Sequence, residues 1–225
     1  MRIGILQTGD APKDLLAEHG DYPEMFARLL DGYGFEFRTW RVVDLQFPMD
    51  EEQADGWLIT GSRHGVYEDH AFLPPLEALI RDAYAAHVPM VGICFGHQII
   101  AKALGGRVEK FAGGWSVGAT PYRFDDETLT LNAWHQDQVV EAPAGAERLA
   151  TSDFCTNAAL IYDDRALTIQ AHPEFPDRFI DGLIRTRGEG VVPDPLLQQA
   201  RARLGQPNDS DRIADRIAEF FLQPR

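Results

Sequence analysis

The chain has 225 residues, is 44% hydrophobic and carries a formal net charge of −14 at pH 7. This length suits one α/β domain with a substantial core. The negative charge argues against a nucleic-acid partner, because phosphates would be repelled, and no apolar run approaches the roughly 20 residues that cross a bilayer. The N-terminus shows no signal-peptide pattern and only two cysteines are present, so we expect a cytoplasmic protein that binds neither nucleic acid nor membrane.

Strand-like and helix-like segments alternate through the first hundred residues. The apolar run 3–6 predicts a strand buried on both faces. Asp21 and Glu24 form a capping-box pattern, and the helix that they begin is expected to end at Gly32. Further strands are predicted at 35–43, 55–60 and 88–93, and further helices at 75–87 and 97–104. Strands separated by helices imply right-handed crossovers and a parallel sheet.

The pattern changes after residue 107. Residues 107–124 and 128–140 predict hairpin strands that form an antiparallel flap on the sheet edge. Residues 159–175 predict a strand pair that turns at Asp163 and Asp164, and the chain beyond Phe175 predicts helices. The last helix places Ile213, Ile217 and Phe220 on one face. We therefore predict the α/β class, with a mainly parallel central sheet, helices on both faces and a small antiparallel flap.

The segment GICFGHQ, residues 92–98, places Cys94 between Gly92 and Gly96 at a predicted strand-to-helix junction. This G-x-C-x-G spacing is the cysteine form of a nucleophile elbow, in which the crowded turn excludes a Cβ from its neighbours. Helix N-termini also lower thiol pKa values, which favours the nucleophilic thiolate. The alternative is that Cys94 is a small buried cysteine between packing glycines. Cys155 has no such motif, and we expect it to be a small packed residue.

A base for this cysteine is available in the segment QAHPEF. His172 follows a predicted strand, where α/β sheets present functional groups. Glu174 lies two residues later, and on an extended backbone its carboxylate can reach the imidazole and orient it. If this segment is considered alone, the alternative is an exposed histidine beside a solvated glutamate.

An oxyanion site is predicted at a second strand end. The glycine-containing turn at Gly61 and Ser62 can bring backbone N–H groups close to a substrate, and the N–H of Phe95 supplies another donor. A simple strand-to-helix turn would use the same residue types. His64, Asp69 and His70 follow in the same loop, but their spacing fits no standard zinc pattern, so we expect no metal there.

Together, GICFGHQ, HPEF and TGSRHGVYED resemble the class I, triad-type glutamine amidotransferase family, over roughly residues 3–187. The chain is most similar to stand-alone members related to the glutaminase domain of GMP synthase. The resemblance implies a flavodoxin-like fold and a single domain over residues 1–225, with 188–225 as a helical extension. It also implies an amidohydrolase without a cofactor, in which Cys94 attacks the γ-carboxamide of glutamine, His172 shuttles the proton and Glu174 orients His172. A γ-glutamyl thioester forms, ammonia leaves, and water hydrolyses the thioester.

The resemblance also implies a substrate pocket and limits the choice of partner. Gln98, His135 and Asp137 match pocket residues of the family, whereas Ser62 departs from the second glycine that relatives often have, and is tolerated if its φ is negative. No synthetase domain or phosphate-binding loop is recognisable. Three functions stay open: a glutaminase that supplies a synthetase or another ammonia acceptor, a γ-glutamyl peptide hydrolase, and a non-catalytic regulatory subunit of the same fold.

Overall fold

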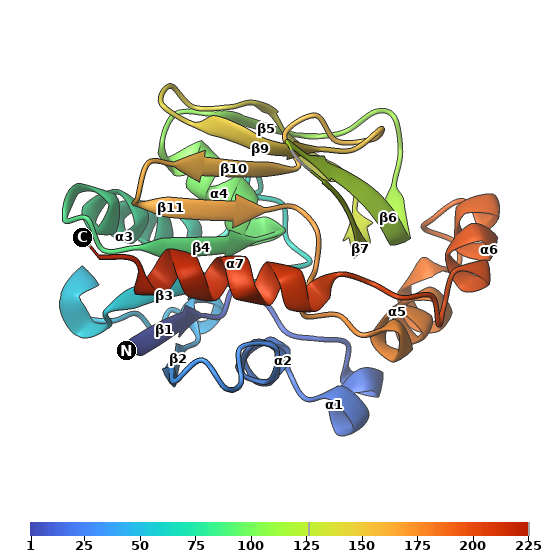
Figure 1. Cartoon of the computed structure of the whole chain (residues 1–225), viewed down its shortest axis with the longest axis horizontal. Coiled ribbons are helices and arrows are strands. Elements are labelled where there is room, and N and C mark those ends of the chain that lie inside the picture. The colour runs from blue at the N-terminus through green and yellow to red at the C-terminus, as the bar shows by residue number, and fades with distance from the viewer. Residues whose placement is uncertain (126, 225) are drawn as a thin grey trace.

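A nine-stranded sheet forms the centre of the protein (Figure 1). The structure is a computed structural model that describes residues 1–125 and 127–224. Its strands are β1 (Arg2–Leu6), β2 (Glu36–Trp40), β3 (Gly56–Ile59), β4 (Met90–Ile93), β5 (Arg107–Lys110), β6 (Ser116–Phe124), β7 (Thr128–His135), β8 (Asp137–Glu141), β9 (Glu147–Thr151), β10 (Ala159–Tyr162) and β11 (Ala166–Ile169). Its α-helices are α1 (Lys13–His19), α2 (Tyr22–Leu29), α3 (Leu73–Ala85), α4 (Phe95–Ala103), α5 (Asp177–Leu183), α6 (Asp194–Ala202) and α7 (Ser210–Leu222).

The strand order of the main sheet is β2-β1-β3-β4-β11-β10-β9-β6-β7. The first five strands in this order are parallel, and the pairs from β11 to β7 are antiparallel. The α/β class, the parallel centre and the flanking helices are therefore confirmed. The five parallel strands all direct their carboxyl ends to one edge, where α/β sheets collect functional groups.

Helices cover both faces of the parallel strands. On one face, α2 and α7 pack their apolar side chains against Ile3, Ile5 and Val91. On the other face, α3 and α4 pack against Trp57 and Ile59. Figure 1 shows α7 crossing in front of the strands, with α3 and α4 behind them. The central strands β1, β3, β4 and β11 are buried on both faces, which explains their nearly continuous apolar sequences, whereas the edge strand β2 is mostly exposed.

The antiparallel region is more extensive than the predicted flap. β6 and β7 form the expected hairpin, but β6 also pairs with β9 and so joins the main sheet. The strand predicted at 107–124 is divided, because Gly113 and Gly114 interrupt it and Gly114 has a φ of 102°. The first part, β5, pairs with β8 in a separate two-stranded sheet. That small sheet is the antiparallel flap.

Local predictions had mixed outcomes at the element ends. The capping box of Asp21 and Glu24 is present at the start of α2, and the predicted apolar face of α7 is buried. The strand predicted at 35–43 ends at Trp40, because the chain turns to bury Val42 in the core.

No helix in the described ranges 1–125 and 127–224 is long and apolar enough to cross a membrane.

Candidate active site

The candidate site lies at the carboxyl ends of three neighbouring parallel strands, β3, β4 and β11. Ile59 is in register with Gly92, and Ile93 is in register with Ile169, so the three strands end at nearly the same level. The segments that follow them carry Gly61, Cys94 and His172 respectively. Residues distant in sequence thus meet at one sheet edge.

Cys94 occupies a strained turn between β4 and α4. It is the N-cap residue of α4, with φ 53° and ψ −100°, a conformation that a residue with a side chain rarely adopts. An added Cβ at Gly92 would lie 2.5 Å from the Gly96 carbonyl oxygen, and one at Gly96 would lie 2.3 Å from the Ile59 carbonyl oxygen. The expected reason for both glycines is therefore confirmed: the crowded turn has no space for a Cβ at either position.

His172 and Glu174 form a buried hydrogen-bonded pair. The Nδ1–H group of His172 donates to Oε1 of Glu174 over 2.7 Å, and the two residues are 4% and 5% exposed. Burial opposes protonation of His172, but the negative charges of Glu174 and Cys94 outweigh it and raise the pKa of His172 to about 10. Because Nδ1 is engaged by Glu174, Nε2 is the ring nitrogen left to act on Cys94. The arrangement favours a protonated imidazole at His172 beside Cys94.

Gly61 borders both groups. An added Cβ at Gly61 would lie 3.0 Å from Cε1 of His172 and 3.9 Å from Cβ of Cys94. The strand end of β3 is thus brought against the cysteine and the histidine, and the role of this turn as an oxyanion site stays a prediction. Ser62 has a negative φ, because it is not among the non-glycine residues with positive φ. The departure from a second glycine therefore imposes no backbone strain.

Thr8 and Thr60 hold this turn in place. The Thr60 hydroxyl donates to the Gly61 carbonyl over 3.0 Å, and the Thr8 hydroxyl lies 3.0 Å from the same oxygen. The Ser62 hydroxyl donates to the Thr8 carbonyl over 2.8 Å. A trans peptide directs its N–H away from its C=O, so a fixed Gly61 carbonyl also fixes the direction of the Ser62 N–H.

The three predicted pocket residues meet around one backbone carbonyl. The carbonyl of Asp137 accepts from Nε2 of Gln98 over 3.0 Å and lies 3.2 Å from Nδ1 of His135. Burial lowers the pKa of His135 to about 3, so this imidazole is neutral. The Asp137 carboxylate accepts from the Tyr67 hydroxyl over 2.9 Å, and burial raises its pKa. The structure brings these residues together, and their contact with substrate stays a prediction.

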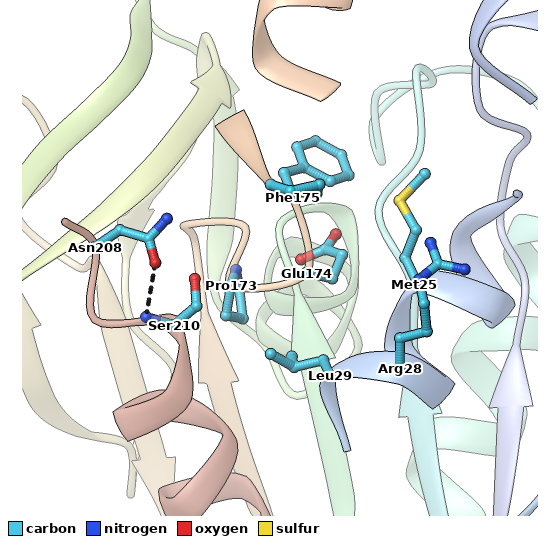
Figure 2. A pocket seen from close by; sticks show the side chains of 9 residues that line it. Met25, Arg28, Leu29, Pro173, Glu174, Phe175, Asn208 and Ser210 are labelled. Carbon is cyan, nitrogen blue, oxygen red and sulfur yellow. Dashed lines mark hydrogen bonds between the residues drawn. The ribbon is translucent and has the colours of Figure 1, made fainter. Parts of the chain in front are cut away.

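A cavity of about 260 Å³ lies beside Glu174 (Figure 2). Its walls come from α2, from the segment 173–176 and from the start of α7, and neither Cys94 nor His172 is among its lining residues. Oε2 of Glu174 and Oγ of Ser210 are buried without a hydrogen-bond partner in the described part of the chain. Figure 2 shows both side chains at this cavity, with Asn208 accepting from the Ser210 backbone. The cavity therefore adjoins the carboxylate that orients His172, rather than the nucleophile.

Sequence reasoning missed two kinds of supporting residue. Thr8 follows β1 at the same sheet edge as Cys94, so the strand-end rule could have singled it out. Phe175 stacks on the ring of His172, and Tyr67 reaches Asp137 from a loop seventy residues earlier; no local pattern marks either contact. Cys155 is fully buried, and burial raises its pKa to about 12, as expected for a packed thiol.

Comparisons with known proteins identify the family of the chain. The family described as "Glutamine amidotransferase class-I" matches residues 21–179. Gamma-glutamyl peptidase 4 of Arabidopsis thaliana is 30% identical over 91% of this chain and 88% of its own length. The glutamine-hydrolyzing GMP synthase subunit of Archaeoglobus fulgidus is 33% identical over 71% of this chain and 87% of its own length. A solved glutamine amido transferase from Methylobacillus flagellatus superposes with a TM-score of 0.78 at 24% identity, covering 98% of this chain and 91% of that one. The chain belongs to the class-I glutamine amidotransferase family.

Proposed function

We propose that this protein hydrolyses a γ-glutamyl amide bond through a Cys94–His172–Glu174 triad. The observation that carries the proposal is the position of Cys94 at the N-terminus of α4, in a strained turn, with the His172–Glu174 pair against the same glycine turn. Nucleophile, base and orienting carboxylate are the three parts that covalent acyl transfer needs. The nucleophile follows β4, and the base and the orienting carboxylate both follow β11.

The reaction begins with attack of the Cys94 thiolate on the γ-carbonyl carbon. The carbonyl oxygen becomes an oxyanion, which the backbone N–H groups of Ser62 and Phe95 stabilise at the Gly61 turn; such a donor contributes about 2.7–4 kcal/mol. His172 gives its proton to the departing nitrogen, and ammonia or an amine leaves. A γ-glutamyl thioester remains on Cys94. His172 then takes a proton from water, which attacks the thioester and releases glutamate and the thiolate.

A γ-glutamyl peptide is the substrate class favoured by the extent of the similarity. The alignment with the γ-glutamyl peptidase spans 91% of this chain, whereas the alignment with the GMP synthase relative spans 71%. Four relatives that align over 91–100% of this chain are named γ-glutamyl peptidases, which supports a peptide as the leaving group. Glutamine is the second candidate substrate, with the released ammonia passing to a synthetase partner, because one relative is itself named as a subunit of GMP synthase.

The test compares γ-glutamyl dipeptides with free glutamine, using the purified chain, a Cys94→Ala variant and a matched Cys155→Ala control. We expect turnover by the wild type and the Cys155 variant, no turnover by the Cys94 variant, and a higher kcat/KM for the dipeptides. Added hydroxylamine should divert product to the γ-glutamyl hydroxamate, because it competes with water for the thioester. Full activity of the Cys94 variant would refute the triad, and a strong preference for glutamine would replace the peptide by the second candidate.

A non-catalytic regulatory role is the third reading of the same fold. A glutamine-analogue electrophile should label Cys94 but not Cys155 if the site is competent. Failure to label Cys94 in folded protein would support the regulatory role instead.

A further inference from the structure

Two imidazoles and a carboxylate meet in the loop between β3 and α3. The ligand atoms of His64, Glu68 and His70 all lie within 4.8 Å of one another. Oε2 of Glu68 is 2.7 Å from Nε2 of His70 and 3.8 Å from Nδ1 of His64. From the sequence, Asp69 was the acidic residue considered with the two histidines, and no metal was expected there. In the structure it is Glu68 whose carboxylate lies beside both imidazoles.

The loop holds these groups in place without a ligand. The two imidazole rings have centroids 4.1 Å apart, and both pack against the buried ring of Phe72. The backbone N–H of Glu68 donates to the Gly65 carbonyl, which closes a turn that aims the carboxylate back at the histidines. Rigid support of this kind lowers the entropic cost of assembling a binding site.

The cluster combines support from the protein with access for an ion. The side chains of His64, Glu68 and His70 are 19%, 45% and 31% exposed, which leaves one side of the cluster open to solvent.

We propose that His64, Glu68 and His70 bind a divalent transition-metal ion of the Zn²⁺ class, with water completing the coordination. Imidazole nitrogen and carboxylate oxygen are ligands that this class accepts. Bonds of about 2.0–2.2 Å in tetrahedral geometry place ligand atoms about 3.4 Å apart. The 2.7 Å and 3.8 Å separations lie on either side of this value, and all three donors lie within 4.8 Å of one another. Side-chain rotations that move donor atoms by up to about 1.4 Å bring the three donors to one ion.

The site is coupled to the oxyanion turn through the backbone. The N–H of His64 donates to the hydroxyl of Ser62 over 3.2 Å, and Tyr67 in the same loop binds Asp137. A bound ion would therefore restrain the conformation of residues 64–70, the segment that connects the oxyanion turn to the pocket wall. The ion takes no part in the proposed hydrolysis, and its binding can be measured without turnover.

The test uses the full chain without an affinity tag and with Cys94→Ser, because the thiolate beside His172 is the strongest competing zinc ligand. Zn²⁺ is titrated by calorimetry, and the shift in Tm with Zn²⁺ is recorded. We expect one ion per chain and a rise in Tm. His64→Gln and His70→Gln should each weaken binding by at least about tenfold and remove the rise in Tm.

Two matched controls separate this site from general surface binding. Asp69→Asn removes the neighbouring exposed carboxylate, and His87→Gln removes an exposed imidazole elsewhere; both should bind Zn²⁺ as the parent does. No binding to the Cys94→Ser protein, or equal binding by the His64 and His70 variants, would overturn the proposal. An equal loss of Zn²⁺ affinity in the Asp69→Asn and His87→Gln controls would also overturn the proposal. None of these outcomes bears on the triad, which is tested by turnover alone.

Discussion

The phenyl ring of Phe175 lies flat against the imidazole of His172, with ring centroids 3.9 Å apart and planes 4° from parallel. Asn132 fixes both ends of this turn, because its carbonyl accepts from the His172 N–H over 2.8 Å and its side chain donates to the Phe175 carbonyl over 2.9 Å. Glu174 holds the edge of the same imidazole. The ring of His172 is therefore fixed by a stacked face and a hydrogen-bonded edge.

Phe175→Leu should remove the stacked face while keeping an apolar side chain. We expect kcat to fall by about tenfold with little change in KM, because a misaligned imidazole transfers its proton less effectively. Steady-state kinetics measure the effect. Phe179→Leu is the control, since Phe179 packs on Phe175 in the same buried cluster. An equal fall in kcat for both variants would attribute the effect to general packing.

Glu174→Gln should lower the pKa of His172, because the carboxylate charge that raises it is lost. The proton then leaves His172 well below the wild-type value of about 10, so the alkaline limb of kcat/KM moves to lower pH. We expect kcat to fall by about 10²–10⁴-fold. The exposed Glu147→Gln serves as the control, and an unchanged pH profile in Glu174→Gln would contradict the orienting role.

The local parts of the site were predictable from sequence because they depend on neighbouring residues. Gly92 and Gly96 flank Cys94 within one turn, and the structure shows the backbone contacts that exclude a Cβ there. His172 and Glu174 lie two residues apart after a strand, and they do form a hydrogen bond. The parallel pairing of the first four strands follows from the alternation of strands and helices.

The long-range parts were not predictable, because no local pattern encodes them. Thr8 reaches the Gly61 carbonyl only because β1 and β3 are neighbours in the sheet. The pairing of β5 with β8 depends on the break at Gly113 and Gly114, which a strand pattern over 107–124 overlooks. The meeting of His64 with His70 likewise requires the loop conformation.

Thr8→Val should loosen the oxyanion turn. The variant keeps the shape of the side chain but removes the hydroxyl beside the Gly61 carbonyl, so the Ser62 N–H is less firmly directed. We expect kcat to fall by about tenfold. The Gly61 carbonyl keeps the Thr60 hydroxyl as a partner, so the loss of one buried hydrogen bond should cost about 0.5–1.5 kcal/mol of stability. Kinetics and urea unfolding measure the two effects. Thr8→Ser restores the hydroxyl and should recover most of kcat; failure to recover would argue against the hydrogen bond.

Cys94→Gly should produce a more stable protein than Cys94→Ala. The φ of 53° and ψ of −100° strain a residue that carries a Cβ, and glycine relieves this strain. The expected difference is about 1–3 kcal/mol in the free energy of unfolding. Ala101→Gly within α4 is the control and should lower stability by about 1 kcal/mol. A Cys94→Gly variant less stable than Cys94→Ala would show that the turn is not strained.

Acid should destabilise the protein through His97. This side chain is fully buried with Nδ1 2.8 Å from the Thr168 hydroxyl, and burial lowers its pKa to about 3. Below pH 6.5 the unfolded chain binds a proton at His97 that the folded chain does not, so stability is present above pH 6.5 and is lost as the pH falls towards 3. Between pH 6.5 and 5 the loss is about 2 kcal/mol for this one group.

His97→Gln should reduce this pH dependence. Glutamine can still hydrogen bond to Thr168 but does not titrate. The slope of the free energy of unfolding against pH, between pH 6.5 and 5, should therefore be smaller in the variant than in the wild type, by the slope that corresponds to about one bound proton. Urea unfolding at several pH values measures the slope, and the variant's lower stability at pH 7 does not affect the comparison. His87→Gln, at an exposed site, should keep the wild-type slope. If His97→Gln also keeps it, the buried imidazole is not the group that binds the proton on unfolding.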